Sequence, residues 1–229
     1  MSGRATNPLT VAAALFDLDG TLINSEPRSR ELWKRLFAAH GVPSTAELLA
    51  SFGGRRSRDV IAEQLHRFGP ELTAEDLRRY LRGLDEQSGL PEVVLMRGAR
   101  TLLDMLRDEG IPTALVTSGS RTYATDHLTR LGIADYFTTL VTADDIIHGK
   151  PNPEGYLLAC RRLEVSPRDA LVFEDSEAGF QAAQASGARY IAVGSTPAAG
   201  AQAVVADLAD TPAIRRGGGG VGGVTAQNA

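Results

Sequence analysis

The chain has 229 residues and a formal net charge of −4, so it carries no general attraction for polyanions such as nucleic acids. Its single cysteine, Cys160, excludes an intrachain disulfide and a multi-cysteine zinc site. The longest apolar run, Val11–Phe16, is far shorter than the roughly 20 residues that span a membrane, and the acidic residues directly after it argue against a secretory signal. We therefore expect a cytoplasmic monomer without nucleic-acid or membrane partners.

Strands and helices alternate along most of the chain, which is typical of an α/β protein with a parallel sheet. The candidate strands are apolar at odd and even positions alike, as expected of strands that are covered on both faces. We predict a Rossmann-like, three-layer α/β/α core. Its strands are Val11–Phe16, Thr113–Val116, Thr139–Val141, Ala170–Phe173, Tyr190–Val193 and, with a weaker pattern, Ala203–Ala206. Its helices are Ala99–Arg107, Tyr123–Leu131, Pro153–Leu163 and Glu177–Ser186.

The stretch from residue 23 to residue 91 interrupts this alternation, because it contains no convincing strand. Helical periodicity instead covers Arg30–Ala39, Val60–Phe68 and Ala74–Leu84. We interpret residues 23–91 as an all-helical cap domain over the carboxyl edge of the sheet. Residues 9–22 and 92–212 then form a discontinuous core. We expect residues 213–229, which are rich in glycine, to be a disordered tail.

Acidic residues follow two of the predicted strands. Asp17 and Asp19 come directly after the first strand, and Glu174 and Asp175 end a later one. Each pair alone also fits an acidic turn or a helix cap. Because the strands are parallel, however, all four carboxylates would meet at one sheet edge. Two carboxylates about 4 Å apart repel by about 4 kcal/mol at an effective dielectric constant of about 20, so the group requires a cation such as Mg²⁺.

Two further motifs reach the same edge. The segment Val116-Thr117-Ser118-Gly119 ends one strand and supplies a hydroxyl and free backbone N–H groups. The segment Gly149-Lys150-Pro151-Asn152-Pro153 holds one lysine between two prolines. A lone lysine is usually solvated, but the chain has only one other, Lys34, among its 24 basic residues. We therefore expect Lys150 to supply a second positive charge, besides Mg²⁺, that offsets the carboxylates.

In this order, the sequences FDLDGTL, VTSGS, GKPNP and FEDS resemble the four motifs of the haloacid dehalogenase superfamily, in its phosphatase branch with a helical cap. The similarity covers Ala12–Gly194. It implies a phosphoric monoester hydrolase that uses Mg²⁺ and an aspartyl-phosphate intermediate. It implies that Asp17 is the nucleophile and that Asp19 is the general acid and base, with a backbone carbonyl that also binds the metal.

The resemblance extends to the other motif residues. It implies that Thr117 donates a hydrogen bond to the phosphoryl group and that Lys150 neutralises charge on that group and on the nucleophile. Asp175 would bind the metal, and Glu174 would bind it directly or support the residues that do. The metal set is then Asp17, Asp19, Glu174 and Asp175.

The cap loop Phe52–Ser57 is the predicted substrate-recognition element, although it also fits a solvated helix start. Its Gly54, Arg55 and Arg56 could approach phosphate or polyol oxygens, together with Ser118 and Gly119 of the core. This loop, with VTSGS and GKPNPEGY, most resembles phosphatases of small sugar and polyol phosphates. We therefore expect a small phosphorylated sugar or polyol as the substrate.

Alternatives stay open at this point. β-Phosphoglucomutases of the same superfamily typically carry a histidine in the first cap helix, where this chain has Ser29, so hydrolysis is favoured over mutase activity. Phosphonate hydrolysis would need a cap lysine at the site, and Lys34 fits a solvated helix face better. A non-catalytic binding or regulatory module of the same fold is a third possibility. It is disfavoured because every catalytic motif residue is present.

Overall fold

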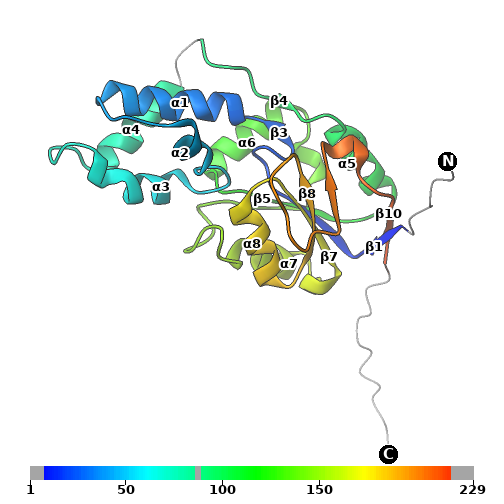
Figure 1. The fold of residues 1–229 in the computed structure, drawn as a ribbon. Helices are drawn as coiled ribbons and strands as arrows, with labels where there is room; N and C mark the ends of the chain where they lie inside the picture. Colours follow the sequence, from blue (N-terminus) through cyan, green and yellow to red (C-terminus); the bar gives the residue numbers. More distant parts are fainter. Residues whose placement is uncertain (1–7, 86–88, 218–229) are drawn as a thin grey trace, which may run out of the picture.

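A six-stranded sheet forms the centre of the molecule, and its strands β5, β7 and β8 are labelled in Figure 1. The strand order is β6-β5-β2-β7-β8-β9. The computed structural model describes residues 8–85 and 89–217. Every neighbouring pair of strands is parallel, so all carboxyl ends meet at one edge and the predicted α/β class is confirmed. The strands are β2 (Ala13–Phe16), β5 (Thr113–Val116), β6 (Thr139–Val141), β7 (Ala170–Glu174), β8 (Arg189–Val193) and β9 (Ala203–Val205).

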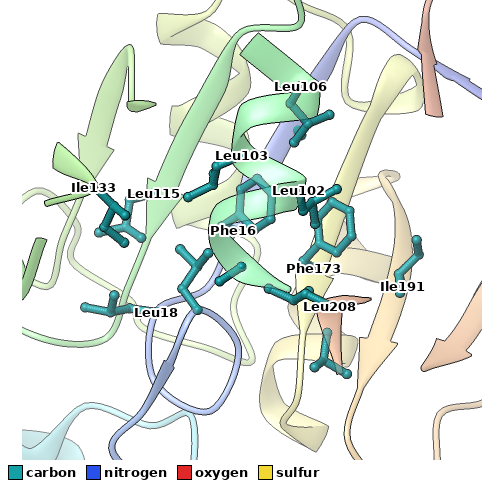
Figure 2. Close-up of a cluster of buried hydrophobic side chains, with 14 of the residues drawn as sticks. Phe16, Leu18, Leu102, Leu103, Leu106, Leu115, Ile133, Phe173, Ile191 and Leu208 are labelled. Carbon is teal, nitrogen blue, oxygen red and sulfur yellow. The ribbon is translucent and has the colours of Figure 1, made fainter. Parts of the chain in front are cut away.

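Helices cover both faces of this sheet. Successive side chains of a strand point to opposite faces, and in these strands the side chains on both faces are mainly apolar. Phe16 and Phe173 stack on one face with ring centroids 4.5 Å apart, in a cluster that includes Leu103 (Figure 2). Leu15 and Val172 belong to a second cluster on the other face. The first cluster includes residues of α5 (Ala99–Asp108) and α6 (Arg121–Arg130), and the second includes residues of α7 (Glu154–Arg162) and α8 (Glu177–Ser186).

The predicted strand Val11–Phe16 is divided in two. β1 (Leu9–Val11) pairs with β10 (Ile214–Arg216) in a separate small sheet, and only β2 enters the main sheet. Between them, the backbone N–H of Ala12 donates to the carbonyl of Asp169 at 2.7 Å. The run is apolar throughout, so its pattern alone could not show that the two halves have different partners.

The predicted tail, residues 213–229, began too early, because it includes the strand β10. We expected disorder from residue 213, but Ile214 is buried and β10 is a paired strand. An apolar side chain next to the core outweighs the glycine-rich context that follows it. The rest of the predicted tail, from residue 218 to residue 229, lies outside the described residues.

Among the described residues, four helices lie between two short strands that connect to the core (Figure 1). β3 (Ile23–Asn24) pairs antiparallel with β4 (Val94–Leu95), so the region predicted to lack strands opens on a very short one. The predicted helix Val60–Phe68 ends in a 3₁₀ turn, Leu65–Arg67. Other 3₁₀ turns are Ala134–Tyr136, Pro167–Asp169 and Leu208–Asp210. The four helices are α1 (Glu26–Ala39), α2 (Ala46–Ala50), α3 (Ser57–Gln64) and α4 (Ala74–Asp85).

These four helices have a hydrophobic core of their own. Trp33 and Phe52 meet with ring centroids 5.0 Å apart, and Phe37 and Leu77 belong to the same buried cluster. That cluster shares no residue with the two sheet clusters, which agrees with an inserted helical cap. The division at residues 23 and 91 stays a prediction. Within the described residues, no helix is long and apolar enough to cross a membrane.

Candidate active site

Asp17 lies at the centre of the carboxyl edge of the sheet. It follows β2, where Phe16 is in register with Leu115 of β5 and Phe173 of β7. Its backbone N–H donates to the carbonyl of Phe173 at 3.0 Å, and the residue is 2% exposed. The parallel register therefore brings the ends of β5 and β7 to either side of this carboxylate.

Lys150 connects the carboxylates of two neighbouring strands. Its ammonium group donates to Asp17 Oδ1 and to Glu174 Oε1, and all three side chains are buried. Burial by itself works to lower the pKa of Lys150, but the charges of Asp17 and Glu174 outweigh it and hold the pKa above its ordinary value. The lysine therefore remains a cation at the sheet edge.

Glu174 is held by several donors besides Lys150. The hydroxyl of Tyr156 donates to Oε1 at 3.1 Å, and the backbone N–H groups of Asp175 and Ser176 donate to Oε2 at 2.8 and 3.0 Å. The Ser176 hydroxyl adds a further bond to Oε2 at 3.0 Å. With both oxygens occupied, the carboxylate is well placed to orient Lys150.

Asp17, Glu174 and Asp175 form a group that could hold a metal ion. One carboxylate oxygen from each lies within 4.8 Å of the others. Asp17 Oδ2 is buried and has no hydrogen-bond partner among the described residues. Burial, together with the neighbouring carboxylates, raises the pKa of Asp17 well above its ordinary value. Three carboxylates thus face one ammonium, and this all-oxygen donor set with a free buried oxygen fits Mg²⁺.

The loop around Gly20 shapes this group. Gly20 has a positive φ of 84°, and a Cβ there would collide with the carboxylate of Asp175. The Thr21 hydroxyl donates to Asp175 Oδ1 at 3.3 Å. Burial and the charge of Glu174 raise the pKa of Asp175 to about 8. The backbone after Asp19 therefore approaches this carboxylate as closely as glycine allows.

The raised pKa of Asp175 predicts how stability depends on pH. A carboxyl whose pKa rises from 3.8 to about 8 on folding contributes stability that is complete below the lower value and lost as pH rises through the higher one. In the metal-free protein, we expect the unfolding free energy to fall from pH 4 to pH 8 relative to an Asp175→Asn variant. Added Mg²⁺ should recover the loss in wild type only. Urea unfolding of both proteins, with chelator or with Mg²⁺, measures this, and parallel curves for the two would contradict it.

Asp19 is held by two hydroxyl groups. Its Oδ1 accepts hydrogen bonds from the hydroxyls of Ser25 at 2.5 Å and Tyr123 at 2.6 Å. It is not one of the three carboxylates that converge on a common point. Its predicted part in metal binding is through the backbone carbonyl, and that part stays a prediction.

The predicted residues after β5 lie next to the cap loop. Thr117 is buried, and its hydroxyl oxygen accepts from the N–H of Gly119 at 3.0 Å. The Ser118 hydroxyl donates to the carbonyl of Gly54 at 2.7 Å. A Cβ on Gly54 would collide with the Ser176 side chain. The structure therefore brings Gly54, Ser118 and Gly119 to the same edge as the carboxylates.

The two predicted arginines of the cap loop have protein partners instead. Arg55 donates to Glu63 at 2.5 Å. Arg56 is 6% exposed and donates to Asp59 at 2.6 Å and to the carbonyl of Ile147 at 2.8 Å. A Cβ on Gly149 would collide with the Arg56 guanidinium. Arg56 therefore joins the cap to the loop that carries Lys150, and its substrate role stays a prediction.

We expect the two arginines to differ when each is replaced by alanine. Arg56→Ala removes a nearly buried guanidinium that bonds both Asp59 and the carbonyl of Ile147, and it should lower kcat/KM about tenfold. Arg55→Ala removes an ion pair with an exposed partner and should change kcat/KM less than about twofold. Steady-state kinetics on one phosphate ester compares them directly. Equal effects would contradict the assignment of Arg56 to the contact between cap and core.

The sequence did not single out Tyr123, Tyr156 or Ser25. Tyr156 belongs to the quoted run GKPNPEGY. Its hydroxyl reaches Glu174 because α7 packs against β5 and β6 of the sheet. Tyr123 was predicted to begin a helix, but α6 begins at Arg121 and places the tyrosine in its first turn. The position of Tyr123 after the N-cap Ser120 places it in the first turn of α6, but no local sequence pattern connects it with Asp19.

Comparisons with known proteins agree with this geometry. A family model described as haloacid dehalogenase-like hydrolase matches residues 14–193. The chain is 44% identical over 174 residues to validoxylamine A 7'-phosphate phosphatase of Streptomyces hygroscopicus subsp. limoneus, covering 76% of this chain and 81% of that protein. It is 32% identical over 188 residues to phosphorylated carbohydrates phosphatase of Thermotoga maritima, covering 78% and 83%.

A solved structure supports the same assignment. The putative beta-phosphoglucomutase from Thermotoga maritima superposes with a TM-score of 0.65 at 30% identity, covering 84% of this chain and 93% of that one. The predicted enzyme class is confirmed, because the matched family is one of hydrolases and the relatives are named phosphatases. The chain belongs to the haloacid dehalogenase-like hydrolase family.

Proposed function

We propose that this protein is a Mg²⁺-dependent phosphomonoester hydrolase that acts on a small phosphorylated sugar or polyol through an aspartyl-phosphate intermediate. The observation that carries the proposal is how the two carboxylate oxygens of Asp17 are held. Lys150 holds one of its oxygens, and the other is buried with no hydrogen-bond partner in the part of the chain that the structure describes. A carboxylate fixed in this way is oriented to attack an electrophile.

The reaction divides into two displacements. In the first, an Asp17 oxygen forms a bond to phosphorus as the bond to the ester oxygen breaks, and Asp19 gives its proton to that leaving oxygen. In the second, Asp19 takes a proton from water, whose oxygen attacks the phosphorus and releases phosphate from Asp17. Lys150 and the Thr117 hydroxyl offset charge on the phosphoryl oxygens. Asp17, Glu174, Asp175 and the Asp19 carbonyl would hold Mg²⁺, which neutralises charge on the nucleophile and the phosphoryl group when bound.

The names of two relatives support a carbohydrate-like substrate. One is a phosphatase for validoxylamine A 7'-phosphate, and the other acts on phosphorylated carbohydrates. We infer that this chain also takes a phosphate ester of a hydroxyl-rich molecule, with Gly54, Ser118 and Gly119 nearest to it. The monomeric state and the cytoplasmic location stay predictions.

A mutase is the second candidate, because the putative beta-phosphoglucomutase shares the fold. Ser29, where the mutases typically carry a histidine, is exposed on α1 and offers no imidazole for phosphoryl transfer back to a sugar. Lys34 is also exposed, with 68% of its side chain accessible, as expected for a solvated helix face.

Product analysis distinguishes the two candidates. With β-glucose 1-phosphate and a panel of sugar and polyol phosphates, we expect free phosphate and the dephosphorylated alcohol, in a reaction that chelation stops and Mg²⁺ restores. The isomerised sugar phosphate as the main product would establish the mutase. Turnover that persists after complete chelation would contradict the metal-dependent mechanism.

A further inference from the structure

A tyrosine outside the family motifs contacts the proposed acid and base. Tyr123 lies in the first turn of α6, and its hydroxyl donates to Asp19 Oδ1 at 2.6 Å. The Ser25 hydroxyl donates to the same oxygen at 2.5 Å. Asp19 Oδ1 thus has two donors, while Asp19 itself is only partly buried. One oxygen of this carboxyl is occupied by the protein, and these two bonds leave the other oxygen available.

Packing fixes the tyrosine ring in this position. A Cβ at Gly119 would lie 2.8 Å from Tyr123 Cδ1, so the ring lies directly against the glycine. The buried His127 contacts the ring edge-on, with centroids 4.4 Å apart. The N–H of Tyr123 donates to the Ser120 hydroxyl at 3.2 Å. The ring is therefore wedged between Gly119 and His127, and its hydroxyl has a defined direction.

The hydroxyl is also held as a donor. A phenol is protonated at neutral pH, because its ordinary pKa is about 10, and a carboxylate oxygen can only accept, so the Tyr123 hydroxyl is the donor in this bond. A donor that stays protonated makes Asp19 Oδ1 the less basic oxygen of the carboxyl group, because its lone pairs are already engaged. A proton on this carboxyl then resides on Oδ2.

We propose that Tyr123 is a positioning residue for Asp19: its hydroxyl occupies Oδ1, so that Oδ2 carries the proton that passes to the leaving oxygen. This inference rests on the proposed phosphatase function. In the first displacement, the proton on Oδ2 moves to the ester oxygen as the bond from that oxygen to phosphorus breaks. The tyrosine keeps its own proton throughout, and the two hydroxyl bonds to Oδ1 remain to stabilise the Asp19 carboxylate that results.

If Tyr123 positions the proton of Asp19, the loss of kcat/KM in Tyr123→Phe should depend on the basicity of the leaving group. A purely structural role would lower kcat/KM equally for all esters. An ester with a basic leaving oxygen needs the proton, whereas p-nitrophenolate leaves almost without it. We therefore expect Tyr123→Phe to lower kcat/KM about tenfold for glycerol phosphate and phenyl phosphate, and less than about threefold for p-nitrophenyl phosphate. kcat/KM is the informative constant because it reports the displacement in which this oxygen departs.

Tyr136→Phe is the matched control. The Tyr136 hydroxyl donates to Asp104 Oδ1 at the same distance of 2.6 Å, but the residue precedes β6 at the opposite edge of the sheet. Its kcat/KM should match wild type for all three esters. Thermal unfolding of both variants shows whether loss of either hydroxyl alters the fold.

The outcomes separate this inference from the function on which it rests. A steeper dependence of kcat/KM on leaving-group basicity in Tyr123→Phe alone supports the positioning role. An equal loss for all three esters, or no loss, in an active wild-type background would overturn it and leave the phosphatase intact. A wild-type protein that hydrolyses none of the phosphate esters with Mg²⁺ present would overturn the proposed function and this inference with it.

Discussion

Asp17→Asn is expected to lower phosphatase turnover by about a thousandfold or more, because an amide cannot form the acyl-phosphate bond on which both displacements depend. The fold should survive the change. Burial raises the pKa of Asp17, which means that its charged form is unfavourable in the metal-free protein, and asparagine is neutral and of the same size. We therefore expect a thermal midpoint equal to or above that of wild type without metal.

The experiment compares Asp17→Asn with Asp126→Asn, which changes an exposed aspartate on α6. Phosphate release from p-nitrophenyl phosphate with Mg²⁺ should disappear in the first variant and be unchanged in the second. Brief incubation with substrate and mass analysis of the denatured protein should find a phosphoryl adduct on wild type only. Retained turnover in folded Asp17→Asn would rule out Asp17 as the nucleophile.

Replacing Lys150 should affect both activity and stability. Lys150→Met leaves the buried carboxylates of Asp17 and Glu174 facing each other without their shared cation, and removing one partner of a buried ion pair costs about 3–5 kcal/mol. We expect a loss of that order in the unfolding free energy at pH 8. The loss should shrink towards pH 4, because the raised pKa of Asp17 lets that carboxyl group take up a proton as the pH falls. Turnover should fall at least about a hundredfold, because charge on the phosphoryl group loses its counter-ion.

The other lysine of the chain is the control for this change. Lys34→Met alters an exposed side chain on the cap and should leave urea unfolding and kinetics within error of wild type. Lys150→Arg is the informative second variant. It restores a cation, but a planar guanidinium cannot take the place of a compact ammonium that contacts both carboxylates and lies 5.4 Å from the centre of the Tyr156 ring. We expect stability to recover in part and activity to stay low, and near-normal turnover in Lys150→Arg would show that the lysine is incidental.

Much of the fold could be predicted because the relevant signals are local. Three elements have the predicted bounds: Thr113–Val116, Thr139–Val141 and Glu177–Ser186. Each ends where a polar residue or a glycine follows the apolar run or the helical pattern. Helix α1 begins at Glu26, four residues before its predicted start, because the apolar stripe begins later than the Ser25-Glu26-Pro27 segment that opens the helix. The β1–β10 pair could not be predicted, because it joins two segments about 200 residues apart in the chain.

The sequence by itself determined that Asp17, Lys150, Glu174 and Asp175 meet at the candidate site. Acidic and hydroxyl residues follow parallel strands directly, Lys150 lies in the loop after another strand, and parallel strands place their carboxyl ends along one edge. Only the tertiary structure decided what each side chain does there. It directs Arg56 to the carbonyl of Ile147 and surrounds Glu174 with donors. It also brings Tyr123 from α6 to Asp19, 104 residues away along the chain. These contacts depend on packing and side-chain direction between distant segments, which spacing along the chain does not encode.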